Sequence, residues 1–386
     1  MYKIPMVCLI GILSAPILEA AEWSLSGTVD PSLEYDDNIF MRDTEKLGDY
    51  HATMRPTLKV MHQLEHTETS LSTGYVIDRY DALSELDTEN PFVSLSTQYN
   101  TQRSQWGLDI NYTENTSRSD AADDTGDFET NSISTTESIS PSFSYQLTEK
   151  DSLSVNARYT EREYSTTDFS NSKNRQLSAN WQHQFTERFN GGVSFLVNNN
   201  KSKSLTSFTD DDTYNFSVTT SYDLSEIWAI NGSVGVRELS SERTGDFGVV
   251  NSNTSTGSSL DLTISYKKNQ DTASISLSQS VSPSNSGDVN EQEKIRASWS
   301  RDLTENISAT IIASFQTTES AIDDGNDKRE NISVSPSINW MFSPEATLGL
   351  SYNYRQQKES EADTDAVSNA LMFTLNYNWD GFRVSR

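Results

Sequence analysis

The chain has 386 residues, of which 34% are hydrophobic and 22% are charged. Its 29 basic residues against 56 acidic ones give a formal net charge of −27, which argues against nucleic acid as a partner because nucleic-acid binding requires a basic surface. The mean hydropathy of −0.62 and the absence of 18 consecutive apolar residues after the first 21 exclude a helical membrane protein.

The first 21 residues have the composition of a secretory signal peptide. Lys3 precedes an apolar run from Met6 to Leu18, and small residues follow. We place cleavage after Ala20 or Ala21, which leaves residues 22–386 as the mature domain. Because Cys8 is the only cysteine, we expect the mature chain to have no disulfide and no thiol chemistry.

Apolar and polar residues alternate with a period of two along much of the mature chain, as expected for β-strands. Within residues 105–112 the apolar positions are Trp106, Leu108, Ile110 and Tyr112. Residues 176–185, 259–266 and 371–379 show the same pattern. A barrel wall that alternates lipid-facing and lumen-facing side chains has a polar average composition, so the low hydropathy does not indicate a soluble chain.

Short connections of similar sequence recur between the alternating segments. They begin at Leu147, Phe185, Leu224, Tyr266, Leu303 and Phe342, which are 37 to 42 residues apart. Each interval holds two strands, one short turn and one long polar loop. Outer-membrane barrels have short periplasmic turns and longer outer loops, so we assign the short turns to the periplasmic side.

The pattern predicts an all-β, antiparallel, up-and-down transmembrane barrel in the outer membrane, with about 18 strands; 16 remains possible because the first pair is weakly defined. The predicted ranges are 23–35, 50–63, 69–79, 91–100, 105–117, 132–147, 152–164, 174–185, 189–200, 213–224, 227–240, 257–267, 272–282, 292–303, 306–318, 330–342, 346–357 and 367–379. An even count places both termini of the chain on the periplasmic side.

Three further features refine this barrel. All seven tryptophans lie near a predicted short turn or a strand end on that side, as an aromatic girdle requires. The segment 371–379 should close the barrel against the first strand. Four prolines fall inside predicted strands, and we expect a bulge at each because proline cannot donate to the ladder; they are Pro31, Pro56, Pro141 and Pro336.

The residues that catalysis or metal binding would need are sparse. The four histidines have no cysteine partner and no metal-ligand spacing, and no nucleophile with a positioned base can be identified. We therefore predict no enzyme activity, no cofactor and no metal site. Acidic clusters in predicted loops, such as residues 120–127 and 210–212, could bind divalent cations, but solvated loop surface is the simpler interpretation.

The inward positions are mostly serine, threonine, asparagine and glutamine. Neutral hydroxyl and amide groups suit a hydrated path for sugar hydroxyls better than an ion filter, which needs rings of like charge. The alternative is that any porin lumen is polar. The charged residues predicted to line the lumen are Asp78, Asp109, Arg158, Asp223, Arg237, Asp261, Lys294, Arg296 and Arg355.

The first predicted strand ends in Tyr35, Asp36, Asp37, Asn38, Ile39 and Phe40. This motif and the repeated hairpins resemble the β-barrel porin 2 family, which includes outer-membrane barrels associated with exopolysaccharide biosynthesis and export. The resemblance implies a barrel that conducts a secreted polysaccharide, with no catalytic residues. We expect the motif at the first outer loop, where it forms a turn with Asx capping; the alternative is a constriction formed by this loop.

Three hypotheses follow for the function. The first is passive export of an exopolysaccharide or capsular polysaccharide, and the second is a general or nutrient diffusion porin. The third is a surface adhesin or scaffold that transports nothing. The expected partners are outer-membrane lipid and lipopolysaccharide, a polysaccharide chain and periplasmic polysaccharide-export machinery.

Overall fold

The computed structural model describes residues 21–385 except 123, 246–249, 323–327 and 361–363. The first 20 residues lie outside the described part, so the signal peptide at residues 1–21 stays a prediction. No helix in the described part is long and apolar enough to cross a membrane.

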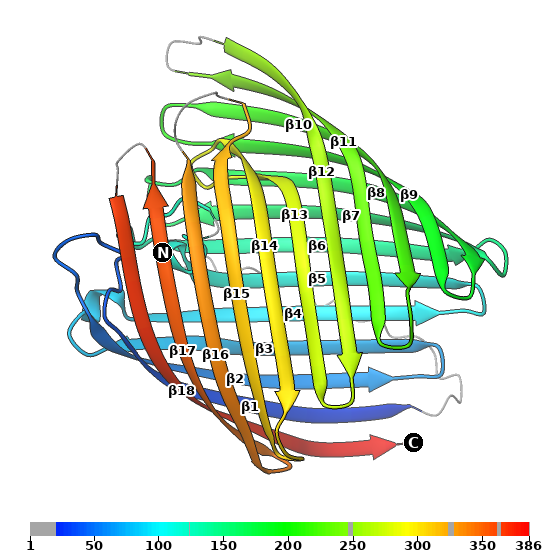
Figure 1. Ribbon diagram of the computed structural model, residues 1–386, viewed down its shortest axis with the longest axis horizontal. Helices are drawn as coiled ribbons and strands as arrows, with labels where there is room; N and C mark the ends of the chain where they lie inside the picture. Colours follow the sequence, from blue (N-terminus) through cyan, green and yellow to red (C-terminus); the bar gives the residue numbers. More distant parts are fainter. Residues whose placement is uncertain (1–20, 123, 246–249, 323–327, 361–363, 386) are drawn as a thin grey trace.

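The described chain forms 18 antiparallel strands, as predicted (Figure 1). They are β1 Glu22–Asp36, β2 Asp49–Gln63, β3 Thr67–Tyr80, β4 Thr88–Asn100, β5 Ser104–Thr116, β6 Ile133–Gln146, β7 Asp151–Tyr164, β8 Asn171–Thr186, β9 Phe189–Lys203, β10 Phe208–Asp223, β11 Trp228–Thr244, β12 Val250–Lys268, β13 Asp271–Pro283, β14 Val289–Asp302, β15 Ile307–Ser320, β16 Arg329–Ser343, β17 Ala346–Glu359 and β18 Thr364–Ser385. Two 3₁₀ turns, η1 Ser84–Leu86 and η2 Ser117–Ser119, lie in the connections. Each strand pairs with its sequence neighbours, and β1 pairs with β18, so the sheet closes into a barrel.

The wall has the predicted two faces. Trp106 and Ile110 on β5 are 53% and 40% exposed on the outside, whereas Gly107 and Asp109 between them are half-buried on the inside. All seven tryptophans lie on the outer surface with exposed fractions between 38% and 53%, near the end of the barrel that carries the short turns. Neighbouring rings support several of them, such as Phe143 beside Trp106. This is the aromatic belt expected where a barrel meets a membrane interface.

The bulges predicted at the four prolines are wrong. On one side of Pro31, Pro56, Pro141 and Pro336 the ladder omits two pairs and then resumes in the same register. A proline removes one donor on one side only, and the flanking pairs hold the register without an extra residue. The register shifts instead lie near short turns, between Leu25 and Gly27, Gln184 and Thr186, and Met341 and Ser343.

Barrel closure uses more of the C-terminal segment than predicted. Strand β18 continues past Trp379 to Ser385, and its last residues pair with the start of β1. Gly381 lies opposite the shift at Leu25, with a positive φ of 56°. A Cβ there would stand 1.7 Å from the Leu25 carbonyl oxygen, so only glycine fits this bulge.

We therefore expect Gly381→Ala to weaken barrel closure. The left-handed backbone and the contact with the Leu25 carbonyl should lower the free energy of unfolding by roughly 1–3 kcal/mol. Thermal unfolding of the refolded barrel, followed by circular dichroism, measures the change. The matched control is Gly245→Ala, because a Cβ at Gly245 meets nothing within 4 Å. Equal unfolding temperatures for the two variants would contradict the role of Gly381.

The wall overlaps itself where β12 meets β13. Strand β12 pairs with β11 along its whole length, but with β13 only from Leu260 to Lys268. Beyond this paired part, β11 packs against the start of β14 and the end of β15, which are not its neighbours in the sheet: Leu239 is completely buried against Val289 and Ala321. This overlap also buries Arg237, which pairs with Glu291 at 2.8 Å.

Strand β10 begins at Phe208, five residues before the predicted start. Asp210, Asp211 and Asp212 therefore lie in a strand and not in a solvated loop, and Asp211 is only 1% exposed. The interpretation of this acidic cluster as loop surface is wrong, because the overlap covers the inner face of β10.

Candidate functional site

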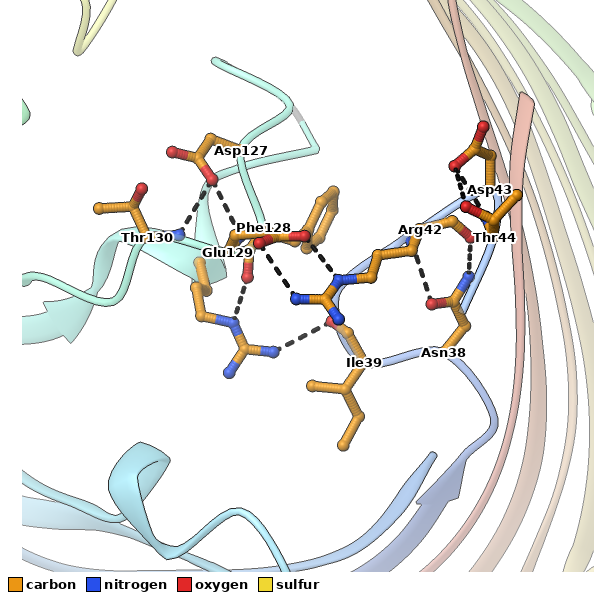
Figure 2. Close-up of polar contacts among 10 residues, drawn as sticks. Asn38, Ile39, Arg42, Asp43, Thr44, Asp127, Phe128, Glu129 and Thr130 are labelled. Atoms are coloured by element: carbon orange, nitrogen blue, oxygen red, sulfur yellow. Dashed lines mark hydrogen bonds and ion pairs between the residues drawn. The ribbon is translucent and has the colours of Figure 1, made fainter. Parts of the chain in front are cut away.

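The long connections at one end of the barrel fold inward and bond to one another. We call this set the loop layer; it consists of the β1–β2 loop (37–48), the β5–β6 loop (117–132), the β7–β8 loop (165–170) and the β13–β14 loop (284–288). Figure 2 shows the β1–β2 and β5–β6 loops meeting inside the curved wall of strands.

The β1–β2 loop is anchored by the motif that ends β1. Asp36 Oδ1 accepts the Asn38 backbone N–H at 2.8 Å, which is the predicted Asx turn. The Asn38 side chain, fully buried, donates to the carbonyls of Arg42 at 2.7 Å and Val367 at 2.9 Å. Asp36 also accepts hydrogen bonds from Arg355 on β17 and Ser368 on β18. The motif thus holds the loop against the inner wall.

The β5–β6 loop crosses the mouth of the barrel. Its carbonyls at Ala122 and Gly126 accept hydrogen bonds from Asn331 on β16 and Gln357 on β17, at 2.8 and 3.1 Å. These strands are not neighbours of β5 or β6 in the sheet. A loop that reaches from β5 to β16 must therefore span the lumen.

The two loops are joined by charge and by a small apolar cluster. Arg42 pairs with Glu129 at 2.6 Å, and Arg118 donates to the Ile39 carbonyl at 3.1 Å (Figure 2 draws both contacts). The guanidinium groups of Arg42 and Arg118 both stack on Phe40, 5.1 and 5.2 Å from its ring centre. Beneath them lies an apolar cluster of Met41, Ala121, Phe128 and Ala366. The Asx turn at Asp36 thus positions a loop that folds into the barrel and bonds to the β5–β6 loop.

Asp124 connects the β5–β6 loop to the β13–β14 loop. Its carboxylate accepts hydrogen bonds from Ser284 Oγ at 2.6 Å and the Asn285 N–H at 2.9 Å. Asn285 in turn accepts hydrogen bonds from Ser170 N–H on its carbonyl and from Arg162 on its side chain. Burial raises the pKa of Asp124 above the ordinary aspartate value of 3.8, although the bonds to Ser284 and Asn285 oppose the shift.

The raised pKa of Asp124 predicts that acid stabilises the closed loop layer. When the closed state has the higher pKa, it binds a proton more tightly than the open state, so closure strengthens as pH falls from the raised pKa towards 3.8 and is unaffected above it. Single-channel recordings across this range should show a lower open probability at acid pH. Asp124→Asn should remove this component, and Asp43→Asn should not, because among the described residues the Asp43 carboxylate bonds to the adjacent Thr44 and to no other loop. An unchanged pH response in Asp124→Asn would contradict the assignment.

The charged residues expected in the lumen fall into three groups by their surroundings. Asp78, Arg237 and Arg355 lie towards the loop end and have partners; His51 and Thr53 hydrogen-bond to Asp78. Asp109 and Lys294 are half-buried. The remaining four, Arg158, Asp223, Asp261 and Arg296, are exposed to water. The structure therefore ties only Arg355 directly to the Tyr35–Phe40 motif, through Asp36.

The described residues contain no group of three or more His, Cys, Asp or Glu side chains that could hold a metal ion. The arginines of the loop layer were not foreseen from sequence. Arg42 and Arg118 lie in polar loop segments without periodicity, Arg162 lies near the end of β7, and no local signal distinguishes the three from solvated charges.

No family model and no curated protein matches the sequence. Solved structures do match: the ferric citrate transporter FecA has a TM-score of 0.54 at 11% identity, with 86% of this chain and 60% of FecA covered. OpdL of Pseudomonas aeruginosa has a TM-score of 0.51 at 9% identity, covering 94% of this chain and 99% of OpdL. The outer membrane protein OpdK of Pseudomonas aeruginosa has a TM-score of 0.50 at 9% identity, covering 92% and 99%.

These likenesses show the fold alone, and this chain spans only 60% of the length of FecA. The closed 18-stranded sheet with an exposed apolar exterior and an aromatic belt is the architecture of an outer-membrane barrel. The chain is therefore an outer-membrane β-barrel protein.

Proposed function

We propose that this chain is an outer-membrane channel for export of a polysaccharide, closed at its outer mouth by the loop layer. The observation that carries the proposal is a belt of hydroxyl groups on the inner wall. Four pairs bridge adjacent strands from β12 to β16: Thr263–Ser276, Ser274–Ser298, Ser300–Thr310 and Ser314–Ser333, at 2.7 to 3.0 Å. We call these residues the hydroxyl belt.

The hydroxyl belt matches the chemistry of a sugar chain. Its residues alternate with Ile275, Trp299 and Ile311, which are exposed on the outer face, so the hydroxyls face inward. A hydroxyl both donates and accepts hydrogen bonds, and neighbouring hydroxyls can exchange partners with a passing sugar without leaving a polar group unsatisfied. Binding at each point is therefore weak, which favours movement over retention.

The motif at Tyr35–Phe40 adds support through its resemblance to the β-barrel porin 2 family. In this proposal the partners are outer-membrane lipid and lipopolysaccharide around the aromatic belt of the outer wall, the exported polymer in the lumen, and periplasmic export machinery at the short-turn end. The charged residues in the lumen are too mixed in sign to select a cation or an anion.

Deletion of the gene tests the proposal. Polymer should accumulate in the periplasm and disappear from the medium, and normal secretion would overturn polysaccharide export. A sharper variant replaces Ser276, Ser298 and Ser314 by valine, which should reduce secretion with little change in ion conductance. The matched control is Thr69→Val with Thr97→Val, a hydroxyl pair bonded at 2.9 Å that shares the outward face of Leu71 and Tyr99.

Two alternatives predict different results in the same measurements. A general or nutrient diffusion porin should show a large conductance that is always open and should pass small solutes freely. A surface adhesin or scaffold should show no channel, and removal of its loops should abolish binding to a surface and leave secretion unchanged.

A further inference from the structure

Asp211 is a buried carboxylate with no basic partner. It is 1% exposed on the inner face of β10, and no lysine, arginine or histidine in the described part of the chain forms an ion pair with it. The nearby carboxylates are paired, because Lys201 binds Asp210 and Arg243 binds Asp288, each at 2.7 Å. A buried charge is costly unless it is paired or coordinates a metal.

Unpartnered amide oxygens lie on the same face as this carboxylate. Asn200 stands directly opposite Asp211 on β9, is 1% exposed, and donates from Nδ2 to Asp211 Oδ2 at 3.3 Å. Asn198 lies two residues away on the same face of β9. The Oδ1 atoms of Asn198, Asn200 and Asp211 are all buried without a hydrogen-bond partner. Ser241 stands opposite Asp211 on β11 and adds a hydroxyl.

We propose that Asp211, Asn200 and Asn198 bind a hard divalent cation of the calcium class. Such cations take six to eight oxygen ligands from carboxylates, asparagine carbonyls and water. One carboxylate with two amides supplies the right atoms, and the cation would satisfy the three orphaned oxygens together with the uncompensated charge. The site needs no cluster of carboxylates or imidazoles, because the amide oxygens complete the set.

The proposed site lies where the wall overlaps itself. Val289 at the start of β14 packs on Leu239 of β11, and Ser202, two residues from Asn200 on the same face, lies beside Gly287. Asp288 in the same loop is paired with Arg243, so it does not compete for the cation. A cation at Asp211 would hold β9, β10 and β11 together beneath the β13–β14 loop.

Calcium titration of the whole refolded barrel in detergent, after removal of divalent ions by EDTA, tests the proposal. Isothermal titration calorimetry should find one site per chain, and the unfolding temperature should rise with calcium and then saturate. Asp211→Asn should lose both effects. The matched control is Asp212→Asn, because this neighbouring carboxylate points to the opposite face and contacts Asn199. It should bind calcium as the unmodified chain does.

Asn198→Ala provides a second variant, because Asn198 is half-buried and its loss should be tolerated in the fold. Calcium affinity should fall about tenfold while the circular dichroism spectrum stays unchanged. The proposal is overturned if the unmodified barrel binds no calcium at millimolar concentration, or if Asp211→Asn and Asp212→Asn bind it equally well. Magnesium added alone should bind more weakly, because it demands a near-octahedral cage.

Discussion

Replacing residues 124–129 with a Gly/Ser segment of equal length should convert the barrel into an open pore. Single-channel conductance in planar bilayers should rise several-fold, with long open times. The replaced segment carries Asp124, Gly126, Phe128 and Glu129, which bind the β13–β14 loop, β17, the apolar cluster and the β1–β2 loop. Barrels of 16 to 18 strands leave an aqueous channel when nothing fills them.

The rise in conductance should be large because the replacement removes all of these contacts at once. The Arg42–Glu129 pair alone is partly exposed and should contribute little, because solvent screens surface ion pairs. A matched control replaces residues 204–207 in the β9–β10 connection, where Ser204 and Ser207 bond to each other. That control should leave conductance unchanged. Equal conductance in both variants would show that the β5–β6 loop does not limit the pore.

A disulfide across the loop layer should stop transport. Ser284 Oγ lies 2.6 Å from Asp124 Oδ1, so cysteines at these two positions face each other across the β5–β6 and β13–β14 loops. Cys8 is the only natural cysteine and lies in the predicted signal peptide, so no other thiol should compete. In the oxidised Asp124→Cys, Ser284→Cys variant the loops cannot separate, and polymer secretion should be lost almost completely.

Reduction of the disulfide should restore transport and raise the open probability above that of the unmodified chain. The reduced variant lacks the carboxylate that joined the two loops, so its open probability should be higher than that of the unmodified chain. Bilayer recordings with and without reductant measure this change, and a secretion assay measures the polymer. The single Asp124→Cys variant is the control for loss of the carboxylate. Undiminished secretion with complete disulfide formation would exclude the lumen as the route of the polymer.

The strands were predictable because the constraint on them is local and periodic. In residues 105–112, as in the last strand, every second side chain faces lipid. Each of these outward positions must therefore be apolar, and the sequence shows this directly. The repeated short turns predicted the number of strands, and the tryptophans beside them predicted that these turns all lie at one end of the barrel. The predicted strand ends differ by five or more residues only at the starts of β10 and β12 and at the end of β18. At the first two, strands extend beyond the alternating region into polar sequence.

The predictions that were wrong rest on properties of single residues, whereas the structure at those positions is set by pairing and packing with other strands. Proline was expected to break the register at Pro336, but the flanking pairs on β17 hold it. The polar sequence around residues 210–212 favours a solvated acidic cluster, but Asp211 is only 1% exposed where β11 packs on the start of β14. In both cases the deciding contacts come from another strand.

The sequence by itself determined a closed antiparallel barrel with an apolar exterior, a polar interior and long loops at one end, and it narrowed the strand count to between 16 and 18. Only the tertiary structure decided that these loops fold into the barrel and bond to one another, because their contacts join residues with no periodic relation. Arg355 meets Asp36 across 319 positions, and Asn331 meets the Ala122 carbonyl across 209. Alternation along a strand is fixed by the geometry of the backbone, whereas the meeting of two loops depends on how the whole barrel brings their ends together.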